Sequence, residues 1–198
     1  MNFMKVSALA RTLIAGTAIY SVAHLAFAEG SPQVRFATTA GDFVVEVYPD
    51  KAPKTVENFL QYVKDKHYDG TLFHRVIPNF MVQGGGFDAK YVQKPTRAPV
   101  VHEGRQAMEK GLRNVPGALA MARTNDPQSA TAQFFINVKD NGFLDPSAQS
   151  PGYTVFGKVV SGMDVVDKIK LTPTGAGGPF GSDVPQTPVL INSATLVK

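Results

Sequence analysis

Two stretches near the start of the chain alternate apolar residues with polar or small ones, which is the period of a half-buried β-strand. The alternation runs over residues 34–38 and again over residues 43–48. Thr39-Ala40-Gly41-Asp42, a sequence of turn-forming character, stands between them. The pattern therefore predicts a β-hairpin at the start of the folded domain.

The next segment changes to a helical period. Pro53 suits the first turn of a helix, because its missing N–H would have no partner there in any case. Apolar side chains then follow at the spacing i, i+3, i+4 and i+7, the stripe of an amphipathic helix, at Val56, Phe59, Leu60 and Val63. Asp69-Gly70 closes the segment.

The remaining elements are short. Strands are expected over residues 73–77, 117–122, 133–138, 153–160 and 188–197, where apolar runs stand between breakers. A short helix is predicted around residues 163–169, with Ser161 and Asp164 as its capping box. The polar or Gly- and Pro-rich residues 87–116, 123–132 and 173–188 are predicted as loops.

Many short strands and two helices without a βαβ rhythm indicate a mainly β fold, an antiparallel β-barrel capped by helices. The length of 198 residues suits one domain with a sizeable core. The chain has no Cys, which excludes disulfides, thiol nucleophiles and zinc–thiolate sites. Residues 29–198 carry 18 basic against 16 acidic residues, too small an excess to indicate nucleic-acid binding.

Residues 1–28 have the features of a secretory signal peptide. Lys5 and Arg11 supply the positive charge, a mostly apolar stretch follows, and Ala26-Phe27-Ala28 has the small-x-small cleavage pattern. The alternative is an uncleaved membrane anchor, although the apolar stretch is short for a membrane span of about 20 residues. We expect a signal peptide at residues 1–28 and one domain at residues 29–198.

The most informative stretch is Phe73 to Gly86. It brings a cation, Arg75, an amide, Gln83, and the apolar Phe80 and Met81 into close spacing around the turn Pro78-Asn79. Ordinary core packing and an ordinary surface charge would also account for these residues. Its closing Gly84-Gly85-Gly86 is followed by no Lys-Ser or Lys-Thr at Walker spacing, so a phosphate loop is only weakly indicated.

The stretch Phe-His-Arg-Val-Ile-Pro-Asn-Phe-Met-Val-Gln-Gly-Gly resembles the signature of the cyclophilin family of peptidyl-prolyl cis-trans isomerases. Further matches lie at residues 117–123, 133–137 and 155–157, so the resemblance covers roughly residues 33–197. It implies a closed antiparallel eight-stranded β-barrel capped by two α-helices. It also implies an isomerase that needs no metal or other cofactor.

The resemblance assigns a role to each candidate site residue. Arg75 would be the catalytic arginine, Gln83 would contact the substrate backbone, and Gln133 would help to position Arg75. The proline pocket and the path of the peptide would be formed by Phe80, Met81, Phe135, Leu144, Ala122 and Arg123, with Phe143 and Tyr153 beside them. The family more often has Asn where Arg123 stands, so a backbone contact to substrate is expected there.

Two positions depart from the eukaryotic pattern. Phe143 stands where many eukaryotic cyclophilins have Trp, which removes an N–H donor and contact area and predicts weak cyclosporin binding. The family's pocket histidine is replaced, with Tyr153 nearest to its place. These features resemble the bacterial periplasmic branch, and with the signal peptide they predict a periplasmic protein.

The histidines offer less. His74 stands beside Arg75 and could serve as a general base, but strand alternation would turn it into the barrel or its wall if Arg75 faces the site. His67 and His102 have no carboxylate or second His at ligand spacing, so the sequence predicts no metal site there.

The sequence thus leads to a prolyl isomerase that assists the folding of exported proteins, with Arg75 stabilising the twisted prolyl amide. The expected partners are proline-containing unfolded or partly folded polypeptides, with no nucleic acid and no membrane after signal cleavage, and the expected state is a monomer. A non-catalytic proline-peptide-binding chaperone or scaffold module is the alternative. Client proteins and the preference for the residue before proline are left open.

Overall fold

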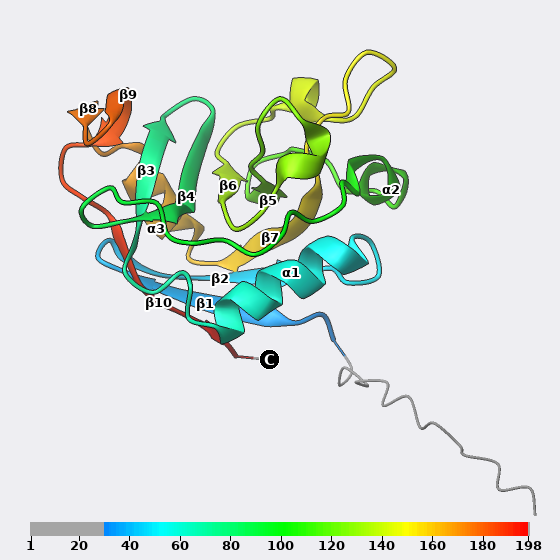
Figure 1. The fold of residues 1–198 in the computed structure, drawn as a ribbon, viewed down its shortest axis with the longest axis horizontal. Coiled ribbons are helices and arrows are strands. Elements are labelled where there is room, and N and C mark those ends of the chain that lie inside the picture. Colours follow the sequence, from blue (N-terminus) through cyan, green and yellow to red (C-terminus); the bar gives the residue numbers. More distant parts are fainter. Residues whose placement is uncertain (1–29, 198) are drawn as a thin grey trace, which may run out of the picture.

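A computed structural model describes residues 30–197, which form a closed β-barrel (Figure 1). Neighbouring strands are antiparallel throughout, in the order β1-β10-β3-β4-β6-β5-β7-β2. The barrel strands are β1 (Gln33–Thr38), β2 (Gly41–Val47), β3 (Thr71–Ile77), β4 (Met81–Asp88), β5 (Ala118–Met121), β6 (Phe134–Asn137), β7 (Val155–Ser161) and β10 (Leu190–Leu196). The predicted mainly β fold, an eight-stranded antiparallel barrel with two longer helices, is confirmed.

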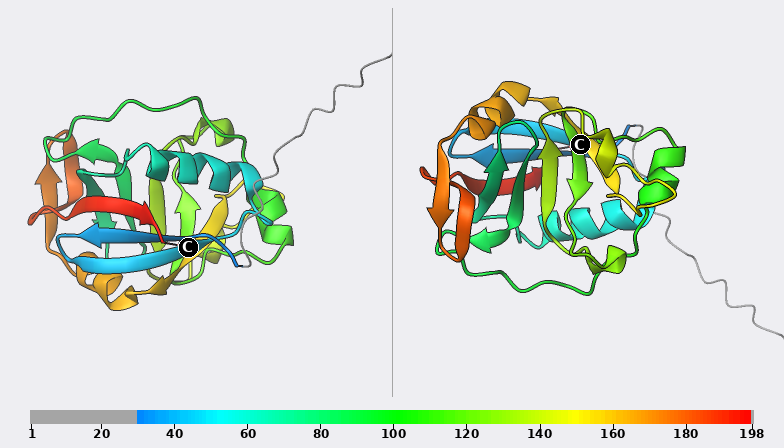
Figure 2. Two further views of the ribbon diagram at one scale, coloured as in Figure 1. Left: turned by 90° about the horizontal axis from the view of Figure 1, so that it is seen from below. Right: turned by 90° about the horizontal axis from the view of Figure 1, so that it is seen from above.

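The two longer helices are α1 (Pro53–Lys64) and α3 (Met163–Lys170), which lie on opposite sides of the barrel in both views of Figure 2. Helix α1 begins at the proline expected for its first turn. Its apolar stripe reaches the interior, since the Phe59 ring lies 5.1 Å from that of Phe156 and 6.3 Å from that of Phe36. The helix therefore covers the aromatic interior of the barrel, which explains why its buried face is apolar.

Three of the local expectations were wrong. Residues 87–116 contain a short helix, α2 (Gly104–Glu109), and residues 173–188 contain a hairpin of β8 (Thr174–Gly177) and β9 (Phe180–Pro185). The Gly and Pro residues of these segments are typical of loops, but tertiary contacts stabilise the helix and the hairpin there. The capping box is also absent: Ser161 belongs to β7, and Gly162, with a φ of 77°, is the N-cap of α3 without a side-chain hydrogen bond.

The predicted signal peptide lies outside the described residues, and so does its cleavage site. Within residues 30–197, the structure contains no helix that is long and apolar enough to cross a membrane.

Candidate active site

A β-bulge on β3 sets the direction of Arg75. Phe73 pairs with Gly84 and Arg75 pairs with Gln83, so His74 is an extra residue on β3. Phe73 and Val76 both belong to the interior core, while the Arg75 side chain is 45% exposed. The plain alternation expected for residues 74–77 is therefore interrupted at His74, because a bulge shifts the two-residue period by one.

Strand register then places Arg75 in a row with residues of three other strands. Arg75 pairs with Gln83 on β4, Gln83 with Phe135 on β6, and Phe135 with Ala120 on β5. Residues directly opposite in a ladder share a face of the sheet. The register thus sets a cation, an amide and an aromatic ring side by side on the outer face of the barrel.

A pocket of about 240 Å³ opens over this row. It is lined by nine of the eleven residues expected from the sequence: Arg75, Phe80, Met81, Gln83, Ala122, Arg123, Phe135, Leu144 and Tyr153. Met81 and Phe135 are buried and form an apolar base with Leu144, apart from the interior core. The ring of Tyr153 meets that of Phe135 edge-on, with centroids 5.5 Å apart. The result is an apolar hollow of side-chain size with a cation and an amide at its edge.

Gln133, one of the two remaining residues, does not line the pocket but is bonded to a residue that does. Gln83 Nε2 donates a hydrogen bond of 3.0 Å to Gln133 Oε1. Gly86 leaves space for Gln133, because a Cβ at Gly86 would lie 2.5 Å from its Cδ. The glycine run thus makes room for a neighbouring side chain, and Gln133 is bonded to Gln83; its expected role in positioning Arg75 stays a prediction.

Phe143, the other remaining residue, lies beside the pocket rather than in its lining. Its side chain is 72% exposed, and its ring stacks on that of Phe80 at a centroid distance of 5.7 Å. It therefore extends the apolar surface at the mouth of the pocket.

Arg123 forms one wall of the pocket through contacts to backbone carbonyls. Its Nε and Nη2 donate to the carbonyl oxygen of Gly152 at 3.0 and 2.8 Å, and its Nη1 donates to that of Thr124 at 2.8 Å. His102 Nε2 also donates to the Gly152 oxygen, at 3.2 Å. Burial lowers the pKa of His102, and the nearby Arg123 charge lowers it further. Arg123 thus joins the segment after β5 to the loop before β7.

The charged partner of Arg75 was missed by the sequence reasoning. Asp183 of β9 lies with Oδ2 3.8 Å from Arg75 Nε. The segment was expected to be loop, and an Asp in a loop gives no signal of what it will face. Only the folding of β8 and β9 beside β3 brings the two charges together.

His74 does not line the pocket and is unsuited to a general base. It is buried, with its ring 4.7 Å from that of Phe87 and 5.5 Å from that of Phe180. Burial lowers its pKa to about 4, so the ring is neutral at pH 7. Within residues 30–197 its Nδ1 has no hydrogen-bond partner. The packing role expected for His74 fits this environment. The ring packs against Phe87 of β4 and Phe180 of β9 and is not part of the core cluster in the barrel interior.

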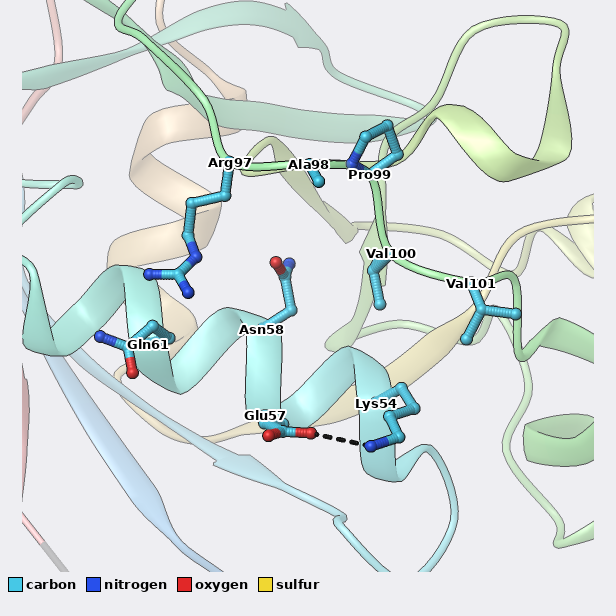
Figure 3. A pocket seen from close by; sticks show the side chains of 9 residues that line it. All are labelled: Lys54, Glu57, Asn58, Gln61, Arg97, Ala98, Pro99, Val100 and Val101. Atoms are coloured by element: carbon cyan, nitrogen blue, oxygen red, sulfur yellow. Dashed lines mark hydrogen bonds and ion pairs between the residues drawn. The ribbon is translucent and has the colours of Figure 1, made fainter.

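A larger cavity of about 600 Å³ lies elsewhere, between α1 and the segment at residues 97–101 (Figure 3). Lys54 and Glu57 form an ion pair at its edge, and Asn58 points into it. Arg97 pairs with Asp65 rather than with a group in the cavity. The polar groups of this larger cavity are thus largely paired or exposed. The cavity does not combine an apolar base with polar donors that point to one place, as the pocket over the Arg75 row does.

Comparison with known proteins gives a consistent result. The sequence model of the family described as cyclophilin type peptidyl-prolyl cis-trans isomerase/CLD matches residues 33–196. A peptidyl-prolyl cis-trans isomerase of Streptomyces antibioticus is 54% identical over 167 residues, which cover 83% of this chain and 98% of the relative. Peptidyl-prolyl cis-trans isomerase B of Escherichia coli is 52% identical over 166 residues, covering 82% and 98% of the two chains.

The fold has solved counterparts. The crystal structure of a cyclophilin type peptidyl-prolyl cis-trans isomerase of Cryptosporidium parvum superposes with a TM-score of 0.66 at 22% identity, over 85% of this chain and 98% of that one. At this identity the likeness concerns the barrel fold alone.

Proposed function

We propose that this chain, which belongs to the family of cyclophilin-type peptidyl-prolyl cis-trans isomerases, uses Arg75 to stabilise the twisted amide of an X-Pro bond. Isomerase activity itself is supported by the family match and by close bacterial relatives that carry this name. The role of Arg75, the client proteins and the compartment are the parts that we propose.

The physical requirement is modest. Rotation about a peptide bond faces a barrier of about 18–20 kcal/mol from amide resonance. As the bond twists, the prolyl nitrogen regains its lone pair and becomes a hydrogen-bond acceptor. A donor that binds this twisted state better than the planar one lowers the barrier without any covalent step. Arginine is suited to this, since it keeps its charge and offers several donors.

The observation that carries the proposal is the row made by Arg75, Gln83 and Phe135. Phe135 belongs to the apolar base that would hold a proline ring, and Gln83 could donate to or accept from the peptide backbone. Arg75 stands one strand further along the same face. A proline seated on the base would therefore present its nitrogen toward the guanidinium.

The test is cis-trans exchange on an Ala-Pro-Phe peptide, measured by NMR or with a coupled protease. We expect Arg75→Ala to lower kcat/KM about 100-fold, the scale for losing one preorganised donor to a transition state. Arg35→Ala is the matched control, because Arg35 is also an exposed arginine paired with a carboxylate, Asp42. Full activity in Arg75→Ala would reject the proposed role.

The alternative is a module that binds proline-containing segments without turnover. It would bind the same peptide, and Arg75→Ala would weaken that binding, but exchange would stay at the uncatalysed rate. The relatives named as isomerases favour the enzyme.

For the biological setting, we propose that residues 1–28 direct export and that the enzyme acts in the periplasm on unfolded or partly folded chains. Uncatalysed prolyl isomerisation takes tens to hundreds of seconds, slow enough to limit folding. Intact mass of the exported protein tests the cut before Glu29, and a retained leader would refute it. Light scattering tests the expected monomer.

A further inference from the structure

We propose that Asp183 is a positioning residue for Arg75, so that the β8–β9 hairpin is part of the catalytic apparatus. Asp183 Oδ2 lies 3.8 Å from Arg75 Nε, and both side chains are partly exposed, at 36% and 45%. The inference rests on the proposed role of Arg75 and adds a second residue to it. Asp183 acts through the arginine and does not line the pocket.

The contact with Asp183 involves one end of the Arg75 guanidinium and leaves its two terminal nitrogens for substrate. Asp183 approaches Nε, at the inner end of the fork, and the Nη groups remain available to a substrate. The two glutamines near Arg75 are bonded to each other instead. Within residues 30–197, Asp183 is thus the carboxylate that restrains a long side chain which would otherwise sample many rotamers.

The backbone of Asp183 is held in an uncommon conformation. Its φ is 63°, in the left-handed region that L-residues rarely adopt, although Asp and Asn tolerate it better than others. Val184, which follows, is 1% exposed and anchors the strand. Such a conformation persists where the surrounding structure determines it, so the strand sets the direction in which the Asp183 side chain leaves the backbone.

An aromatic cluster fixes the hairpin against β3 and β4. Phe180, the first residue of β9, packs on His74 of β3 and Phe87 of β4, with ring centroids 5.5 and 5.1 Å apart. At the turn, a Cβ on Gly178 would lie 2.4 Å from Cγ of Tyr91, so that ring rests directly on the backbone. The cluster therefore holds β9 beside β3 at His74. Because Arg75 is the next residue on β3, the cluster also holds Asp183 of β9 near Arg75.

A carboxylate beside Arg75 has two opposite effects on catalysis. Whether kcat falls or rises when Asp183 is removed shows which effect is larger. Restraint of the rotamers favours catalysis, because the donor is preorganised for the twisted amide. Partial neutralisation of the guanidinium charge opposes it. Our proposal is that restraint prevails, so loss of Asp183 lowers kcat and leaves KM nearly unchanged.

The experiment uses two variants that suit a left-handed backbone. Asp183→Gly removes the side chain without strain, and Asp183→Asn keeps the shape but removes the charge. We expect kcat to fall about 5-fold in Asp183→Gly and less in Asp183→Asn, the range of a partly exposed charge contact. Asp164→Asn, which breaks an exposed pair with Lys168 on α3, is the control for lost charge.

Two further readouts separate positioning from a general loss of structure. The Arg75 Nε–H signal in NMR should sharpen or shift in Asp183→Gly, while the ring signals of Phe87 and Phe180 should stay as in the wild type. In an Arg75→Ala background, which has no side-chain cation to pair with the carboxylate, Asp183→Gly should have no further effect on the residual kcat.

Three results would overturn the proposal: unchanged kcat in Asp183→Gly, a raised kcat, or an equal fall in the Arg75→Ala background. Each of these leaves the role of Arg75 intact if Arg75→Ala lowers kcat/KM about 100-fold as expected. A fully active Arg75→Ala would instead reject the proposed role of Arg75 itself, so the two failures are distinguishable.

Discussion

Arg123 and Tyr153 face each other at one wall of the pocket, with the guanidinium carbon of Arg123 4.5 Å from the centroid of the Tyr153 ring. The cation lies within the distance of a favourable cation–π contact. The same guanidinium holds the carbonyl oxygens of Gly152 and Thr124. The pair thus joins a pocket side chain to two loops, and it lies where the sequence expected only a backbone contact with substrate.

Truncation of this arginine should loosen the wall. Arg123→Ala leaves carbonyl acceptors without their charged donor, so we expect a loss of about 1–2 kcal/mol in urea unfolding. KM should rise about 2- to 5-fold, because Tyr153 loses its support at the pocket. Arg105→Ala is the matched control: it removes a guanidinium contact to Ser147 O in the same loop region, outside the pocket lining. Equal KM changes in both variants would contradict a local role for Arg123.

A side chain at Gly152 should destabilise the fold more than one at a glycine with open space around it. Its φ is +65°, and a Cβ would lie 2.4 Å from the backbone nitrogen of Pro146. Gly111 has a φ of +88° with nothing within 4 Å of its would-be Cβ, so Gly111→Ala reports the backbone strain alone. We expect about 1–2 kcal/mol for Gly111→Ala and about 2–4 kcal/mol for Gly152→Ala in urea unfolding. Similar costs at the two positions would mean that the loop relaxes around the new methyl group.

His74 should make the fold less stable in acid. Its pKa is lowered from 6.5 to about 4 by burial, so below pH 6.5 the unfolded chain binds a proton that the native state does not. The contribution of His74 to the free energy of unfolding therefore falls by about 3 kcal/mol in total as pH drops from 6.5 to about 4. Below about pH 4 this contribution changes no further. His74→Phe, which suits the aromatic contacts with Phe87 and Phe180, should remove this part of the pH dependence.

The measurement for His74 is urea unfolding of both proteins at several pH values between 7 and 4. Carboxylates and the other histidines titrate alike in the two proteins, so the difference between them isolates His74. A constant difference across this range would show that His74 does not titrate as its burial implies.

Phe143 should govern cyclosporin affinity. Its exposed ring stacks on Phe80 at the mouth of the pocket but carries no N–H. We expect weak binding by the wild type and about 10-fold tighter binding by Phe143→Trp, which adds one donor and apolar area. Calorimetric titration measures both affinities, with Phe143→Leu as the variant that loses the stack. Submicromolar binding by the wild type would contradict the expectation.

Local sequence was sufficient where a residue's role depends on near neighbours. The alternation over residues 34–38 and 43–48 predicted the first hairpin, which forms with Thr38 paired to Gly41. The helical stripe from Pro53 predicted α1. The close spacing of Arg75, Phe80, Met81 and Gln83 suggested one patch, and the pocket does contain all four. Each inference depends on a period or a turn, which operate over a few residues.

Local sequence failed where distant segments supply the reason for a structure. The hairpin of β8 and β9 consists largely of turn-forming residues, and its packing comes from Phe87 and Tyr91, far earlier in the chain. Gln133 could be expected near the pocket, but its bond to Gln83 depends on the space that Gly86 leaves on another strand.

The sequence by itself determined the two longer helices, most of the barrel strands, the mainly β class, and the side chains able to bind a proline and a twisted amide. The tertiary structure decided which of them meet. The bulge at His74 turned Arg75 outward, and barrel closure aligned it with Gln83 and Phe135. It also brought Asp183 to its side. The physical reason is that periodicity is a local property, whereas register and charge pairing across strands are set by the packing of the whole barrel.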